Sequence, residues 1–147
     1  MPEVIGIDHI YIAVRDLVRS EPFYDRVMIE ALGFRKNRFE IAGDPHVQYF
    51  NRHFGYVLRP SRDGAFDAYS PGLHHFCFRV DTVEDVQTVA RILRSSGIDA
   101  SPAQLYPHYA PDYWATFFSD PDGIRLEVTN YRQERRDRHD HWEELTK

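Results

Sequence analysis

Three residues of types that commonly bind metals stand among apolar residues in three separate stretches of the chain. Glu127 follows the polar sequence Ser-Asp-Pro-Asp-Gly and lies in a largely apolar run from Ile124 to Val128. His9 and His75 each stand at the start of a stretch in which apolar residues alternate with others. A charge among apolar neighbours is costly unless a partner neutralises it, and a metal ion is a suitable partner. Together the three residues indicate a divalent-metal site of two imidazoles and one carboxylate.

The composition of the chain limits the kinds of protein it can be. Its 147 residues fit one domain, and 42% of them are hydrophobic, as in globular proteins. The formal net charge of −5 argues against non-specific nucleic-acid binding, which needs a basic surface. No apolar run is long enough to span a membrane, and no signal-peptide pattern opens the chain. The single cysteine, Cys77, excludes an intrachain disulfide framework and fits a reducing compartment. From these observations together we expect a cytoplasmic protein with neither nucleic-acid nor membrane partners.

The elements that must position the three candidate ligands begin, in the first half of the chain, with a strand and a helix. Residues 7–14 alternate as a strand with one buried face does, and they place His9 and Tyr11 opposite the apolar side chains. Apolar residues then recur at a spacing of three and four, which predicts an amphipathic helix. We expect this helix to begin near Ser20 and to end at Gly33.

The second half of the chain repeats this order. Residues 75–80 alternate as a strand, and Thr82 with Asp85 three residues later predicts a capping box at the start of a helix. Gly97 is the expected end of that helix. His9 and His75 are 66 residues apart, and so are the last residues of the two predicted strands, Val14 and Val80.

Each half is then predicted to end in further strands. These are expected at Val47 to Asn51, Tyr56 to Arg59, Trp114 to Ser119 and Ile124 to Thr129. Alignment of Gly55 with Gly123 gives an offset of 68 residues and places Arg59 at the position that matches Glu127. A repeat of this length favours two βαβββ modules. We expect an α+β fold in which the two modules form an open, curved mixed sheet around a cavity.

The domain boundaries follow from composition. We predict a single domain over residues 1–131, with one module at about 4–62 and the other at about 72–131. Between them, the Ser-, Asp-, Gly- and Pro-containing stretch from Ser61 to Pro71 is interpreted as a linker. Residues 132–147 carry mixed charge and are interpreted as a solvated C-terminal tail, either a terminal helix or a frayed end.

These motifs resemble the vicinal oxygen chelate superfamily, which includes glyoxalase I, bleomycin and fosfomycin resistance proteins and extradiol dioxygenases. The opening Asp8-His9-Ile10 is similar to the start of the family's first module. The stretch from Gly72 to Val80 resembles the start of its second module. Phe118 to Gly123, followed by Glu127, is its most recognisable signature. The resemblance extends from His9 through Tyr131.

The resemblance implies that His9, His75 and Glu127 are the metal ligands. It also implies a homodimer, because paired modules in this family often complete their cavities by dimerisation, sometimes by exchanging modules. His74 is a rival to His75, and its place in the alternation is expected to direct it toward the helix-side core. The alternative is that both histidines are hydrogen-bonded core residues and that Glu127 pairs with an arginine.

Family members with four protein ligands take the fourth from the last strand of the first module. The repeat places Arg59 there, and a protonated guanidinium has no lone pair to offer a metal. The resulting site has two histidines, one glutamate and open positions. These positions suit a substrate that chelates through two neighbouring oxygens, or a substrate together with O₂. Fe(II), Mn(II), Ni(II) and Zn(II) all suit such ligands, and the metal would act as a Lewis acid.

A loop over residues 106–113 is expected to cross the mouth of the cavity. It offers His108 and Tyr113 as candidate catalytic acid/base residues. The candidate substrate-binding residues are Arg59 for an anionic group and Tyr11 and Phe117 for stacking. Extradiol dioxygenases carry a tyrosine where this chain has Phe117, so the match with ring-cleaving enzymes is incomplete.

Three functions remain open at this point. The first is a metalloenzyme that acts on a small molecule by dioxygenase-type or isomerase/lyase-type chemistry. The second is a bleomycin-resistance-like protein that binds a small molecule without a metal. The third is a regulatory or scaffold protein with a relic site. Because metal-free drug-binding relatives usually lack the ligand set, the presence of His9, His75 and Glu127 favours the enzyme.

Overall fold

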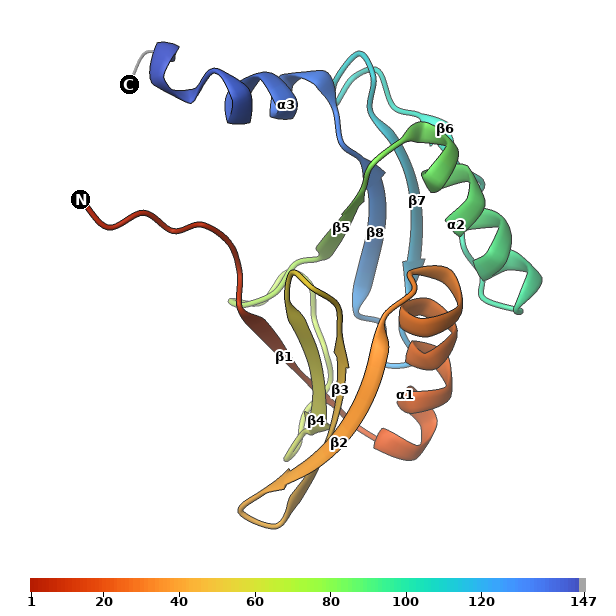
Figure 1. The fold of residues 1–147 in the computed structure, drawn as a ribbon. Helices are drawn as coiled ribbons and strands as arrows, with labels where there is room; N and C mark the ends of the chain where they lie inside the picture. Colours follow the sequence, from red (N-terminus) through yellow and green to blue (C-terminus); the bar gives the residue numbers. More distant parts are fainter. Residues whose placement is uncertain (146–147) are drawn as a thin grey trace.

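Two four-stranded sheets, one from each half of the chain, form the framework of the structure (Figure 1). The structure is a computed structural model in which residues 1–145 are described. The first sheet has the order β1-β4-β3-β2, and its strands are β1 (His9–Val14), β2 (Arg35–Ile41), β3 (Asp44–Phe50) and β4 (Gly55–Pro60). The second has the order β5-β8-β7-β6, and its strands are β5 (Phe76–Val80), β6 (Gln104–Leu105), β7 (Trp114–Ser119) and β8 (Arg125–Asn130).

Both sheets are mixed and have the same topology. The first strand of each module pairs in parallel with the last, β1 with β4 and β5 with β8, and the other neighbours are antiparallel. A helix connects the first strand to the rest, as a parallel pair requires. The predicted α+β fold of two βαβββ modules is confirmed, and the curved assembly stays open rather than closing into a barrel.

The helix of the first module begins earlier than the sequence pattern suggests. Helix α1 (Leu17–Tyr24) starts at Leu17, because the side chain of Asp16 accepts a 3.0 Å hydrogen bond from the backbone N–H of Val18. Ser20, the predicted start, is a buried residue inside the helix. The chain continues into the π-helix η1 (Asp25–Ala31) and leaves it through Gly33 at φ 71°, so the predicted end is confirmed.

The helix of the second module follows its prediction closely. Helix α2 (Val83–Ser95) carries the expected capping box, in which Thr82 Oγ1 accepts from the backbone N–H of Asp85 at 3.1 Å. The Asp85 carboxylate accepts from the backbone N–H of Thr82 at 3.2 Å. Gly97 has a φ of 88°, the left-handed conformation that glycine adopts readily after a helix.

The two helices lie on the same side of the two sheets, and one hydrophobic core runs between both modules (Figure 1). Residues of the first module, such as Tyr24 and Leu58, belong to the same buried cluster as Leu93 and Leu126 of the second. The alternation of β1 is as predicted, since Ile12 and Val14 are buried while His9 and Tyr11 are exposed on the opposite face. That opposite face is free of helices and is available to hold a site.

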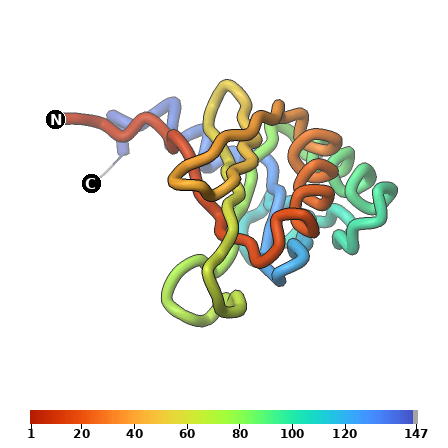
Figure 2. Tube along the Cα trace, turned by 90° about the horizontal axis from the view of Figure 1, so that it is seen from below, coloured from red at the N-terminus to blue at the C-terminus, as the bar shows by residue number. Residues whose placement is uncertain are grey.

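Residues 1–8 and residues 133–145 lie on the side away from α1 and α2 (Figure 2). Residues 1–8 run outward as an extended arm, in which Val4, Ile5 and Ile7 are largely exposed. After β8 the chain forms helix α3 (Gln133–Asp140) and the short 3₁₀-helix η2 (Trp142–Glu144); the last two residues of the predicted tail lie outside the described part. Within residues 1–145, no helix is long and apolar enough to cross a membrane.

Candidate metal centre

The second module surrounds a cavity of about 1130 Å³. Its lining comes from the sheet, from the loop before β7 and from the ends of both helices. Five of the eight candidate residues line it, namely His75, His108, Tyr113, Phe117 and Glu127. Phe117 in β7 lies directly opposite Glu127 in β8, so these two side chains share a face of the sheet. The cavity therefore joins two predicted ligands to two candidate catalytic residues.

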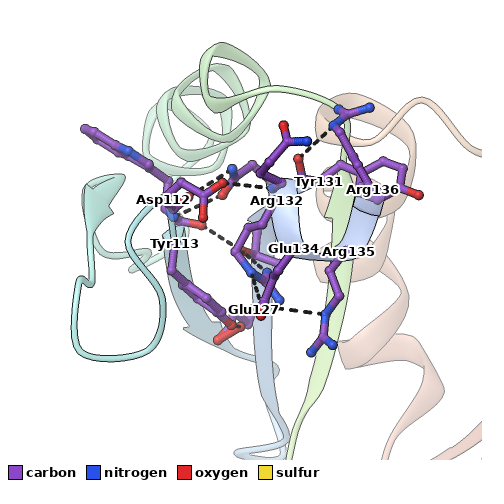
Figure 3. Close-up of polar contacts among 12 residues, drawn as sticks. Asp112, Tyr113, Glu127, Tyr131, Arg132, Glu134, Arg135 and Arg136 are labelled. Atoms are coloured by element: carbon purple, nitrogen blue, oxygen red, sulfur yellow. Dashed lines mark hydrogen bonds and ion pairs between the residues drawn. The ribbon is translucent and has the colours of Figure 1, made fainter. Parts of the chain in front are cut away.

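Glu127 is buried, with 4% of its surface exposed. Its Oε2 atom accepts a 2.5 Å hydrogen bond from the Tyr113 hydroxyl (Figure 3). Among residues 1–145 no lysine, arginine or histidine forms an ion pair with it; the nearby Arg132 pairs with Glu134 instead. A buried carboxylate without a cation is unfavourable. The donor set of this site therefore fits a bound cation.

Two neutral groups border the Glu127 carboxylate. Burial, and then the bond to Glu127, raise the pKa of Tyr113 well above its ordinary value. Cys77 is opposite Glu127 on β5, and burial followed by the contact with Glu127 likewise raises the pKa of its thiol. Both groups therefore stay protonated near neutral pH, and Tyr113 remains a hydrogen-bond donor to the carboxylate.

His75 stands immediately before β5, and His74 lies beside it. The Nδ1 atoms of the two rings are 2.8 Å apart, so one nitrogen donates and the other accepts. His74 is exposed, lines the same cavity and contacts the Tyr69 ring edge-on, at 5.2 Å between centroids. The expectation that His74 points into the helix-side core is wrong, because strand alternation does not extend to a residue that precedes the strand.

His9 lies on the other sheet. Its side chain is 56% exposed, and its Nδ1 lies 2.6 Å from the exposed carboxylate of Asp8. Among residues 1–145 no three His, Cys, Asp or Glu side chains come together closely enough to hold a metal ion. A single copy of the chain thus brings His75 and Glu127 to one cavity and leaves His9 outside it.

The strand pairing corrects the position assigned to Arg59. In the second module, Cys77 of β5 pairs with Glu127 of β8. The first-module counterpart of Cys77 is Tyr11, 66 residues earlier, and Tyr11 of β1 pairs with Val57 of β4. Val57 is therefore the counterpart of Glu127, and Arg59 lies two residues further along the strand. The alignment of Gly55 with Gly123 caused the error. Gly123 forms a turn at φ 86°, whereas Gly55 is the first residue of β4.

The corrected register still provides no fourth ligand, because Val57 is a buried aliphatic residue. Arg59 keeps its place on the same face as Tyr11 and His9, since a shift of two residues preserves the face of a strand. Its guanidinium donates a 2.6 Å hydrogen bond to Asp44 and forms an ion pair with it. The alternative in which Glu127 pairs with an arginine is therefore not seen among the described residues, and Arg59 pairs with Asp44 instead.

The helix-free face of the first module holds a residue that sequence reasoning missed. His46 in β3 is buried between Phe39, whose ring stacks on it at 4.9 Å, and Tyr11, whose ring lies edge-on at 5.7 Å. Its Nδ1 is 2.9 Å from the carbonyl oxygen of Asp44, so Nδ1 carries the proton. Its Nε2 has no partner among the described residues. The period of two in β3 could have identified it.

The loop at residues 106–113 forms an aromatic wall of the cavity. Tyr106 stacks on Tyr109 at 5.8 Å and meets Phe117 edge-on at 5.3 Å. His108 is exposed and lies 4.1 Å from Tyr109 between ring centroids. The predicted placement of this loop at the cavity is supported by His108, Tyr109 and Tyr113, which line it, while Tyr106 contacts the lining residues Tyr109 and Phe117. A flat or apolar group of a small molecule could contact this wall.

Arg132 is the second residue that sequence reasoning missed, because it lies in the charged run after β8. It is 6% exposed, and its guanidinium carbon lies 4.4 Å from the centroid of the Tyr113 ring. The sequence signal was weak, since neighbouring arginines in the same run are on the surface. Its burial beside the cavity makes the start of the C-terminal segment part of the site.

Two βαβββ modules with a buried carboxylate and a histidine in a sheet-lined cavity define the class of protein. The sequence model of the Glyoxalase/Bleomycin resistance protein/Dioxygenase superfamily matches residues 6–128, and the chain belongs to this superfamily. The uncharacterized protein YaeR of Escherichia coli strain K12 is 28% identical in an alignment of 127 residues that covers 83% of this chain and 93% of YaeR.

Two solved structures have folds similar to that of this chain. A glyoxylase/bleomycin resistance protein/dioxygenase domain from Frankia sp. EAN1pec has a TM-score of 0.72 and 26% identity, and the match covers 88% of this chain and all of that one. The fosfomycin resistance protein FosX from Listeria monocytogenes, complexed with Mn(II) and sulfate ion, has a TM-score of 0.63. It is 14% identical over 91% of this chain and 98% of its own, which shows a shared fold.

Proposed function

We propose that the protein is a divalent-metal-dependent enzyme that acts on a small molecule with two neighbouring oxygen atoms. The observation that carries this proposal is the buried Glu127 carboxylate, which has no cationic side chain within ion-pair reach among residues 1–145 and shares a cavity with His75. A metal ion would neutralise that charge. The Mn(II) named in the FosX complex supports the idea that this fold can hold such an ion.

The third ligand in this proposal is His9 of a second copy of the chain. His9 is exposed on a sheet face that carries no helix. β1, which begins with His9, and β5, which directly follows His75, are both edge strands. The exposed apolar arm at residues 1–8 precedes β1 directly and would gain from burial. In such a homodimer, the helix-free face of the first module of one copy would cover the cavity in the second module of the other copy, and the three ligands would come together.

A bound metal would supply Lewis acidity toward the oxygens of the substrate. The side chains of the protein would do the rest. Tyr109 and Phe117, against which Tyr106 packs, would contact an apolar or flat part of the substrate. The exposed His108 imidazole, at the same cavity, is the candidate for proton transfer. Arg59 and Tyr11 would come from the second copy, Arg59 to attract an anionic group and Tyr11 to stack.

A metal-free small-molecule-binding protein is the second candidate, and the aromatic wall formed by Tyr106, Tyr109 and Phe117 favours it. Such a wall binds flat ligands whether or not a metal is present. Metal content distinguishes the two candidates. The enzyme is expected to bind one Mn(II), Fe(II), Ni(II) or Zn(II) per chain, whereas the binding protein is expected to bind none stoichiometrically.

The test is metal analysis of protein purified without chelators, followed by titration with Mn(II). His75→Ala and Glu127→Gln are expected to lose the metal, whereas the matched control His139→Ala, on the exposed tail, is expected to retain it. Wild-type protein that contains no metal and binds none on titration would rule out the enzyme. It would leave the metal-free binding protein as the better description.

The shared site has a test of its own. His9→Ala and His75→Ala each remove one ligand and are expected to bind no metal. When the two variants are refolded together, half of the dimers are mixed, and each mixed dimer has one intact site of two, so about a quarter of the wild-type metal should return. If both ligands come from one chain, the mixture will bind no more metal than either variant alone.

A further inference from the structure

One oxygen of the Glu127 carboxylate is already engaged within the chain. The Tyr113 hydroxyl donates its 2.5 Å bond to Oε2, the short distance expected when a hydroxyl donates to a charged oxygen (Figure 3). A carboxylate can bind a metal through one oxygen or through both. With Oε2 held by Tyr113, Oε1 is the oxygen that remains for a cation.

Arg132 keeps the Tyr113 ring in this position. Its guanidinium carbon is 4.4 Å from the ring centroid, so the cation covers one face of the ring. The guanidinium is itself held from two sides: Nη1 lies 3.4 Å from Thr129 Oγ1, and Nε lies 3.4 Å from a carboxylate oxygen of Glu134. Because Arg132 is buried, the ring cannot turn toward the C-terminal segment without displacing it.

Backbone contacts fix the same arrangement on both sides of the ring. The Asn130 side chain accepts a bond from the Trp114 N–H at 3.0 Å and donates one to the carbonyl oxygen of Asp112 at 3.1 Å. The Asp112 carboxylate accepts from the backbone N–H of Gln133 at 2.9 Å. Asp112 and Trp114, which flank Tyr113, are thus bonded to Asn130, two residues before Arg132, and Asp112 is also bonded to Gln133, directly after it.

From this geometry we propose that Tyr113 and Arg132 are positioning residues that keep Glu127 a one-oxygen metal ligand. Arg132 acts through Tyr113, and Tyr113 acts on Oε2. This assignment rests on the proposed metal site and adds its coordination mode and the role of the C-terminal segment. It also revises the role of Tyr113, which becomes a fixed hydrogen-bond donor to a ligand rather than an acid or base toward the substrate.

The coordination mode decides how many positions are left for the substrate. In an octahedral site, two histidines and a one-oxygen glutamate occupy three positions and leave three for the substrate oxygens and a further ligand. A glutamate bound through both oxygens would leave only two. A substrate that chelates through two neighbouring oxygens would then occupy every open position. Tyr113 therefore preserves the extra position that a co-substrate or water would need.

The experiment uses the full chain in its native oligomeric state, with Mn(II) for affinity and Co(II) for coordination. Affinity is measured by competition with a chromophoric chelator, and coordination by the visible absorption of the saturated Co(II) protein. The variants are Tyr113→Phe, Arg132→Met and the double variant. The matched control is Arg138→Met, because Arg138 is an exposed arginine of the same charged run.

Tyr113→Phe is expected to weaken Mn(II) binding by about tenfold, as loss of an outer-shell partner does. It should also change the Co(II) absorption spectrum, because a second glutamate oxygen takes a position that a water would otherwise occupy. Arg132→Met should shift both readouts in the same direction. The double variant should be no worse than Tyr113→Phe, because Arg132 acts through Tyr113. Arg138→Met should match the wild type.

Two results would overturn the assignment while leaving the metal site intact. One is a Tyr113→Phe protein with wild-type affinity and an unchanged Co(II) spectrum. The other is an Arg132→Met protein that is unchanged in both readouts while Tyr113→Phe is altered. If Arg132→Met does not fold, Arg132→Gln replaces it, with thermal unfolding of the metal-free protein as the check. Wild-type protein that binds neither ion overturns the proposed function and, with it, this assignment.

Discussion

The hydroxyl of Tyr24 donates a 2.9 Å hydrogen bond to the buried carboxylate of Asp120, and this bond joins the helix of the first module to the turn between β7 and β8 of the second. The other oxygen of Asp120 accepts the backbone N–H groups of Asp122 and Ile124, each at 2.8 Å. The most recognisable sequence motif of the chain thus shapes the turn before Glu127 and fastens the two modules together.

The first prediction concerns this bond between the modules. Tyr24→Phe removes a hydroxyl that donates to Asp120 and accepts from Tyr56 at 3.2 Å, and so leaves two buried polar groups without a partner. We expect the free energy of unfolding to fall by about 1–3 kcal/mol, measured by urea denaturation. Tyr69→Phe, which alters an exposed hydroxyl, should change it by less than about 0.5 kcal/mol. Equal effects of the two substitutions would contradict a structural role for Tyr24.

The second prediction is a pH dependence of stability. Burial raises the pKa of Asp120 above its ordinary value and outweighs the hydrogen bonds that lower it. Because the folded pKa is above the unfolded one, the stability from protonated Asp120 is complete below the unfolded pKa and is lost as the pH rises through the folded pKa. Asp120→Asn lacks this titration. The unfolding free energy of the wild type, minus that of Asp120→Asn, should therefore decrease from about pH 3.5 to pH 7.

The urea midpoints of both proteins at several pH values provide the measurement. The subtraction removes the titrations that the two proteins share, including those of the Glu21, Lys36 and Arg38 cluster on the first module. A difference that stays constant or grows with pH would show that Asp120 ionises at least as readily in the folded protein as in the unfolded chain.

Local patterns in the sequence were sufficient to predict the fold class and several of its elements. The alternation in β1, the capping box of Thr82 and Asp85 and the glycine after each helix depend on neighbouring residues only. Strand β2 was missed because its residues are mostly charged or polar and only partly buried, so that no apolar period marks it. β6 is only two residues long and leaves no pattern.

The site was harder to predict because it depends on contacts between distant segments. Residue types and motifs in the sequence identify His75 and Glu127 as candidates, but the two-residue error at Arg59 arose from matching glycines that have different backbone roles. Arg132 is one of several arginines in a charged run, and only the three-dimensional position of Tyr113 distinguishes it. No local pattern in the sequence shows that His9 lies on a different sheet from the one that carries Glu127.

The third prediction uses the corrected register. Val57→Glu places a carboxylate at the counterpart of Glu127, on a buried position of β4. Without metal the buried charge should destabilise the protein by about 2 kcal/mol or more. Mn(II) should recover this loss, because the new side chain would act as a fourth ligand in the shared site. The measurement is thermal unfolding with Mn(II) and with chelator.

Val47→Glu is the control for Val57→Glu. Val47 is equally buried but faces the core on the opposite side of the sheet, so its carboxylate should destabilise the protein with or without Mn(II). Recovery of Val57→Glu but not of Val47→Glu would support the register. A Val57→Glu protein whose unfolding temperature is indifferent to Mn(II) would show that position 57 does not reach the metal.

The fourth prediction addresses His46, whose imidazole is buried between Phe39 and Tyr11 with Nε2 unpaired. If the ring serves packing alone, His46→Phe keeps both ring contacts and removes the unpaired nitrogen, at the cost of the bond to the Asp44 carbonyl oxygen. These effects oppose each other, so its stability should stay within about 1 kcal/mol of the wild type.

His46→Ala removes the ring and leaves a cavity, and should cost about 2–4 kcal/mol in urea denaturation. The comparison of the two variants separates packing from polarity, because only His46→Phe retains the ring. A His46→Phe protein as unstable as His46→Ala would mean that the imidazole nitrogens matter more than the ring contacts.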